Sequence, residues 1–193
     1  MIESVLTRKQ VSTKTKLTVK ALIAAGIVAL AVVLPQLAHL LVGAPAGVRW
    51  LPMYLPVLLG GCLLGVRWGV GIGLAAPLCS FLCTTLAGSP MPAGVRLPFM
   101  MAELAVFGLV SGAFSGKIAR QPLWAFPAVL LAQLSGRGLF LLLVAVFQAA
   151  VPFTPALIAG QIAASWPGLV LQLLAVPGMV AGLRYFLKED SRS

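Results

Sequence analysis

Long apolar runs separated by short polar or glycine- and proline-rich segments make up most of this chain. A transmembrane helix needs about 20 consecutive apolar residues, so the pattern predicts a bundle of six transmembrane helices. The runs cover residues 17–42, 51–65, 69–87, 98–115, 123–150 and 156–187. The second run is short and begins with Pro52 and Pro56, so we expect it to pack inside protein or to line a cavity. Trp166-Pro167 and Pro177 interrupt the last run, which predicts either a kinked helix or a short extra helix.

Composition places the chain in a membrane before any motif is considered. Hydrophobic residues make up 60% of it and charged residues 9%, and its mean hydropathy is +1.04. Soluble domains carry about 25% charged residues. We therefore expect an all-α integral membrane protein with one transmembrane domain at 17–187, preceded by a basic segment at 1–16 and followed by a tail at 188–193. The chain is too short to add a soluble domain of ordinary size.

The basic residues predict the orientation. Six crossings place both termini on one side, together with the turns at 66–68 and 116–122. That side receives eleven Lys and Arg residues, whereas the opposite loops at 43–50, 88–97 and 151–155 carry Arg49 and Arg96. By the positive-inside rule, both termini are cytoplasmic. Topology and anionic lipid headgroups then explain the net charge of +10, with no need for nucleic acid.

Glu103 is the one acidic residue inside the predicted spans, and Arg137 lies about halfway along the fifth span. The other acids, Glu3, Glu189 and Asp190, lie near the chain ends. A charged side chain at this depth usually faces a bundle interior or a water-filled cavity, and is a candidate functional residue. Two interpretations stay open: a structural bridge between the two, or contact of one or both with a polar ligand in an outward-facing cavity. An arginine beside a glutamate suits a zwitterion or a carboxylate-bearing metabolite.

Five further residues are candidates for the same ligand site. Gln133 and Gln172 can orient the charged pair, although glutamines in membranes often only bond a neighbouring helix. His39 lies near the outer end of the first span, close to Trp50 and Tyr54. These two aromatic residues fit either an interfacial belt or the wall of a pocket. A single histidine without a carboxylate or thiol at ligand spacing does not predict a metal site.

Catalytic motifs are missing from the sequence. It contains no G-x-S-x-G nucleophile elbow, no H-E-x-x-H and no phosphate-binding Gly-Lys-Ser/Thr loop. We therefore expect a protein that is not an enzyme and holds no cofactor. If it moves a solute against a gradient, the energy comes from another subunit or from a coupled ion.

Several motifs resemble one family of membrane proteins. The chain reads LPMYLPVLLGGCLLGVRWGVGIGLAAPL at 51–78, SPMP at 89–92, MMAELAVFGLVSG at 100–112 and SGRG at 135–138, and the first span begins with an Ala-x-x-x-Ala motif at Ala21 and Ala25. Together these resemble the substrate-binding S components of energy-coupling-factor (ECF) vitamin transporters. The chain departs from the resembling subgroup at Tyr54, where that subgroup carries a histidine.

The resemblance implies a binder of a vitamin or cofactor precursor in the cell membrane of a prokaryote. Its implied partners are a membrane coupling subunit, contacted through Ala21 and Ala25, and two cytoplasmic ATPases. The implied pocket opens outward and includes the parts of the fourth and fifth spans that hold Glu103 and Arg137. The alternative is a non-transporting membrane scaffold in which these two form only a structural bridge. A solitary ion-coupled carrier is disfavoured because no inverted repeat is detectable.

Overall fold

The computed structural model describes residues 12–43, 49–88 and 91–189, and every regular element in that part of the chain is a helix. The longer helices are α2 (Thr13–Val42), α4 (Tyr54–Leu64), α5 (Val66–Leu86), α6 (Leu97–Ala113), α8 (Ala125–Phe147) and α10 (Trp166–Glu189). The shorter ones are η1 (Gly94–Arg96), α7 (Ser115–Arg120), η2 (Pro122–Trp124) and α9 (Pro155–Ala164). The all-α prediction is confirmed for these residues.

Among the described residues, five helices are long and apolar enough to cross a membrane, as a multi-pass membrane protein requires. They are α2, α5, α10 and the helices α6 and α8 with the 3-10 turns that precede them. The exception is α4, which has 11 residues. At 1.5 Å per residue it is about 16 Å long, well short of a hydrocarbon core of about 30 Å. Five of the six predicted spans are therefore helices with the length and apolar composition to cross a membrane, and the second is not.

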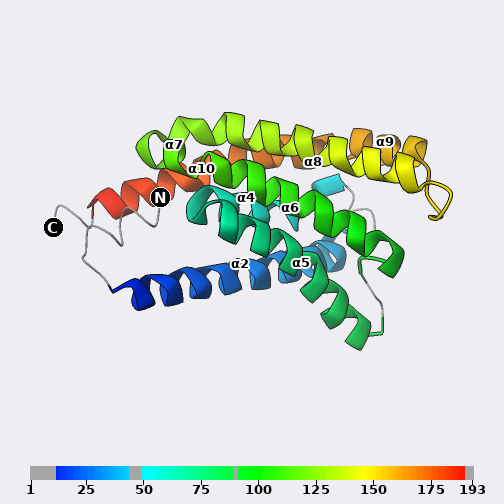
Figure 1. The fold of residues 1–193 in the computed structure, drawn as a ribbon, viewed down its shortest axis with the longest axis horizontal. Helices are drawn as coiled ribbons and strands as arrows, with labels where there is room; N and C mark the ends of the chain where they lie inside the picture. Colours follow the sequence, from blue (N-terminus) through cyan, green and yellow to red (C-terminus); the bar gives the residue numbers. More distant parts are fainter. Residues whose placement is uncertain (1–11, 44–48, 89–90, 190–193) are drawn as a thin grey trace.

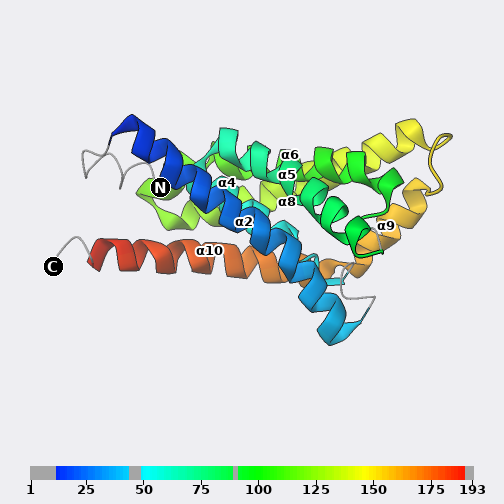
Figure 2. The same ribbon diagram turned by 90° about the horizontal axis from the view of Figure 1, so that it is seen from below.

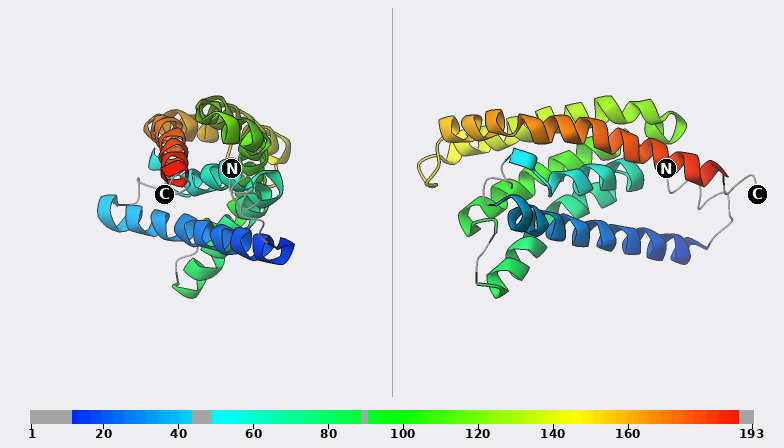
Figure 3. Two further views of the ribbon diagram at one scale, coloured as in Figure 1. Left: turned by 90° about the vertical axis from the view of Figure 1, so that its left-hand side faces the viewer. Right: turned by 180° about the vertical axis from the view of Figure 1, so that it is seen from behind.

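The helices run lengthwise through an elongated bundle. Helix α2 begins, and α10 ends, at the end of the bundle that carries α7, whereas α9 lies at the opposite end (Figure 1). Helix α2 lies obliquely on one face (Figure 2) and contacts α4 and α5. Seen along the long axis, α4 lies between α2 on one side and α8 and α10 on the other (Figure 3, left). The shortest of the apolar spans predicted from the sequence thus occupies the centre.

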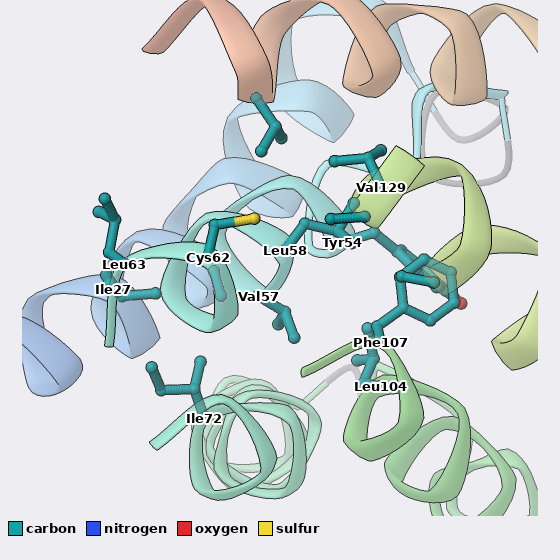
Figure 4. Close-up of a cluster of buried hydrophobic side chains, with 14 of the residues drawn as sticks. Ile27, Tyr54, Val57, Leu58, Cys62, Leu63, Ile72, Leu104, Phe107 and Val129 are labelled. Carbon is teal, nitrogen blue, oxygen red and sulfur yellow. The ribbon is translucent and has the colours of Figure 1, made fainter. Parts of the chain in front are cut away.

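The core of the bundle is built around α4. Nine of its eleven residues are buried, and its side chains Val57, Leu58 and Cys62 are fully inaccessible to solvent. Figure 4 shows these side chains among partners from the surrounding helices, including Leu104 and Phe107 of α6. A segment shorter than the membrane is tolerated because protein surrounds it. The expectation that this segment packs inside the protein is confirmed.

Glycines bring α5 and α6 into backbone contact. A Cβ atom on Gly69 would lie 2.9 Å from the carbonyl carbon of Gly108, and one on Gly112 would lie 2.6 Å from the amide nitrogen of Val66. Gly73 faces the backbone of Leu104 in the same way. Small residues allow this approach, which gives extensive van der Waals contact where no hydrophobic force drives helices together in lipid.

Two predicted connections differ in the structure, and one of the two alternatives predicted for the last run is confirmed. Residues 66–68, expected as a turn, form the first turn of α5, because Gly65 with φ 89° reverses the chain alone. The turn predicted at 116–122 contains most of α7 and the start of η2. The last run divides at Ser165 into α9 and α10, so a short extra helix is present. The predicted segments 1–16, 43–50, 88–97 and 188–193 lie in part outside the described residues.

Candidate functional site

A cavity of about 410 Å³ lies at the end of the bundle that carries α9. Six α-helices line it, namely α2, α4 through Tyr54, α5, α6, α8 and α9, together with residues 51–53 and the 91–96 segment. Most lining side chains are apolar: Pro35, Leu51, Pro52, Met53, Met91, Pro92, Ala93, Met100, Phe140, Ile158 and Ile162. The polar ones are Gln36, His39, Tyr54, Ser80, Arg96, Glu103, Arg137 and Gln161.

Glu103 is the centre of a charged cluster at this cavity. Its carboxylate is fully buried; Oε2 accepts a hydrogen bond from the Tyr54 hydroxyl at 2.7 Å, and Oε1 lies 2.9 Å from Nη1 of Arg137. The Arg137 guanidinium also lies over the Tyr54 ring, 4.7 Å from its centroid. Three residues predicted from the sequence, on α4, α6 and α8, therefore meet at one point.

Gly136 lets α8 approach closely enough for this contact. A Cβ atom there would collide with the ring of Phe107 and would lie 3.3 Å from the backbone oxygen of Glu103. The ring of Phe107 packs edge-on against Tyr54, with centroids 5.2 Å apart. The glycine beside Arg137 in the SGRG motif thus has a physical role, because it brings the arginine to the glutamate.

Arg96 and Gln161 form a second polar contact in the lining. Nη2 of Arg96, at the end of η1, donates a hydrogen bond to Oε1 of Gln161 on α9. The guanidinium also lies 5.7 Å from the centroid of the Phe153 ring. Its Nε is buried without a hydrogen-bond partner, as are Nε and Nη2 of Arg137 and Nε2 of Gln36. Buried donors normally have partners, so each of these needs an explanation.

The segment that carries Arg96 is anchored to α5. The Ser80 hydroxyl donates to the carbonyl oxygen of Met91 at 3.0 Å, and the amide of Met91 donates to Oγ1 of Thr84 at 2.8 Å. Both α5 residues are buried. These bonds hold the Met91-Pro92 part of the SPMP motif against α5, where it contributes to the cavity wall.

Three candidates from the sequence do not line the cavity. Gln172 donates through Nε2 to the carbonyl oxygen of Leu51 at 3.2 Å, and Gln133 donates to Leu169 O at 3.1 Å and to Gln172 Oε1 at 3.3 Å. Leu51 has φ 50°, which is uncommon for a residue with a side chain. The glutamines thus join α8, α10 and the turn that leads to Tyr54. Trp50 is 37% exposed.

No family model, curated protein or solved structure matches this chain. The resemblance to ECF S components therefore rests on the quoted motifs and stays a prediction.

Two lining residues that were not predicted from the sequence, Gln36 and Arg96, could have been identified from their spacing to predicted site residues. Gln36 lies three residues before His39, and Arg96 lies seven residues before Glu103, so each pair falls on one helical face. No pattern in the sequence indicated that Gln161, Met100 or several other residues would line the cavity, because their approach to it depends on how α6 and α9 pack.

Chemically, the cavity combines apolar walls with a small number of polar groups, as small-molecule binding sites do. His39 is the histidine in its lining. Groups of three or more metal-ligating side chains do not occur within the described ranges 12–43, 49–88 and 91–189. The arrangement can hold a ligand of mixed apolar and polar character.

Proposed function

We propose that this chain is the substrate-binding S component of an ECF-type importer, which captures a vitamin or cofactor precursor for ATP-driven uptake. The observation that carries the proposal is the cavity, because it places the buried Glu103–Arg137 pair in the wall of a ligand-sized space. A charged pair serving only as a bridge needs no such space beside it. Intramembrane charges that face a cavity mark substrate sites in transport proteins.

Charge distribution supports an outward-facing cavity. The described basic residues Lys14, Arg67, Lys117, Arg120 and Arg184 lie on segments at the end of the bundle opposite α9. Under the positive-inside rule that end is cytoplasmic. The cavity then faces the outside of a prokaryotic cell membrane, where an importer meets its substrate.

The surface of α2 supports docking of a membrane coupling subunit, which in turn binds two cytoplasmic ATPases. Ala21 and Ala25 are exposed, and so is Gly26, beside which a Cβ atom would meet nothing within 4 Å. Buried residues of this helix, such as Ala24 and Ile27, face the bundle instead. Small exposed residues allow a partner helix to approach closely.

A second candidate function is a non-transporting membrane scaffold. The short contact of 2.9 Å between Arg137 and Glu103 favours it, since each charge already satisfies the other. On this hypothesis the cavity has no ligand, and the pair stabilises the packing of α6 against α8.

Mass spectrometry of small molecules tests the proposal. The full chain is purified gently from its host, washed and denatured, and the released compounds are identified, with Glu103→Gln and Gly108→Ala in parallel. Gly108 lies in the α5–α6 contact and does not line the cavity, so it controls for lowered stability. We expect one stoichiometric compound from the parent and from Gly108→Ala, and none from Glu103→Gln, in which Arg137 loses the carboxylate that orients it.

The same purification also reports on the partners. A coupling subunit and two ATPases should copurify with the parent chain. If no preparation releases a compound and none of these proteins copurifies, the scaffold hypothesis replaces the proposal.

A further inference from the structure

We infer that the cavity selects an amphipathic monoanion, a carboxylate on a largely apolar body, and that Arg96 supplies the positive charge that recognises it. This inference rests on the proposed function and deepens it. The pairing of an arginine with a glutamate in the sequence left zwitterions and carboxylates open. The contacts in the structure distinguish these two ligand classes and favour the carboxylate.

The charge of the lining is the first step. Two arginines and one glutamate line the cavity. Glu103 and Arg137 are in direct contact, so their charges compensate each other. Arg96 has Gln161, a neutral residue, as its hydrogen-bonding partner and a phenyl ring as its other neighbour. The lining therefore carries one uncompensated positive charge, and a ligand that enters a water-poor site with one negative charge would neutralise it.

Buried groups without hydrogen-bond partners also favour an anionic ligand. Arg96 Nε, Arg137 Nε and Arg137 Nη2 are buried donors without acceptors. Glu103 Oε2 accepts a hydrogen bond from Tyr54, whereas Oε1 has no hydrogen-bond partner but lies 2.9 Å from Nη1 of Arg137, with which it forms the ion pair. The described lining thus offers three guanidinium nitrogens without hydrogen-bond partners, whereas its carboxylate is already paired with Arg137. A ligand carboxylate would accept strong charge-assisted hydrogen bonds here, whereas the ammonium group of a zwitterion would have to compete with Arg137 for the Glu103 carboxylate.

The walls determine the rest of the ligand. Prolines, methionines, leucine, isoleucines and Phe140 surround the charged groups, so the body of the ligand is apolar. The volume of about 410 Å³ is near the lower end of the range for ligand pockets. A monocarboxylate of the size of a small vitamin fits this space.

The experiment uses the water-soluble, low-molecular-weight fraction of yeast extract, a rich source of vitamins, as the probe. The fraction is freed of lipid with chloroform and divided on anion and cation exchangers. Each part is then assayed for thermal protection of the purified full chain. We expect protection from the part that the anion exchanger retains, and loss of protection after its carboxylates are converted to neutral amides with a carbodiimide and ammonia.

Two variants test the role of Arg96. Arg96→Gln should weaken binding of the protecting fraction about tenfold or more, as removal of a charged hydrogen-bonding partner does. Arg49→Gln is the matched control, since Arg49 is exposed and does not line the cavity, and it should bind as the parent does. Equal binding by Arg96→Gln and the parent would overturn the assignment of Arg96.

The other outcomes distinguish failure of this inference from failure of the proposed function. Protection by the unretained or the cation-retained part, or protection that survives amidation, contradicts the inference and leaves the proposed function standing. Protection by the chloroform extract alone indicates a fatty acid and contradicts a water-soluble substrate. If no part protects the chain, the proposed function and this inference both fail.

Discussion

The contact between Glu103 and Arg137 predicts strong energetic coupling between the two residues. Glu103 is fully buried and Arg137 has 13% of its side chain exposed, and their charged groups lie 2.9 Å apart. Three variants measure the coupling: Glu103→Gln, Arg137→Gln and the double variant. Each single change leaves one charge without its counterion, whereas the double change leaves two neutral amides.

The magnitudes follow from the surroundings of each group. Removing one partner of a buried ion pair costs about 3–5 kcal/mol. We expect about 3 kcal/mol for Glu103→Gln, because Arg137 keeps the Tyr54 ring and its exposure to the cavity. Arg137→Gln should cost about 4 kcal/mol, since the Glu103 carboxylate is left with the Tyr54 hydroxyl alone. The double variant should also lose about 4 kcal/mol, which gives a coupling energy of about 3 kcal/mol.

Thermal unfolding in detergent is the assay. For a chain of this length, 1 kcal/mol corresponds to a change in Tm of about 2–4 °C. Glu103→Gln should therefore lower Tm by about 6–12 °C, and the double variant should lower it by far less than the sum of the single changes. If the single losses add in the double variant, the two residues do not interact and the ion pair is wrong. Because Glu103→Gln destabilises the chain under both functional hypotheses, only ligand release distinguishes them.

Two further predictions concern the supports of the site. Tyr54→Phe removes the hydroxyl that donates to Glu103 and should cost about 1.5–3 kcal/mol, the range for a hydrogen bond to a charged group, measured by the same thermal unfolding; an unchanged Tm would contradict the bond. Gly108→Ala inserts a methyl group against the α5 backbone and should cost about 1–3 kcal/mol, whereas Gly71→Ala, with open space around it, should leave stability unchanged or raise it by up to about 1 kcal/mol. Equal Tm values for these two alanine variants would contradict the close contact of α5 and α6.

Much of the site was visible in the sequence because it contains so few charged residues. An acid and an arginine inside apolar spans need partners, so Glu103 and Arg137 stood out without any structure. Tyr54 and His39 were selected from their positions near predicted helix ends, and both line the cavity. Gln133, Gln172 and Trp50 were selected on similar grounds but lie outside the lining. A polar residue in an apolar span needs a hydrogen-bonding partner. The sequence does not show whether that partner is a ligand or a group on a neighbouring helix.

Apolar run length and composition by themselves determined the helical, membrane-spanning character of this protein, because backbone groups in lipid must be satisfied within a helix. Only the tertiary structure decided that α4 fills the centre, that Arg96 and Gln161 meet across 65 positions, and that Glu103 contacts both Tyr54 and Arg137. The physical reason is that these contacts depend on helix rotation and tilt. The rotation and tilt of a helix are set by the packing of its whole surface against its neighbours. The order of residues along one helix does not reveal either of them.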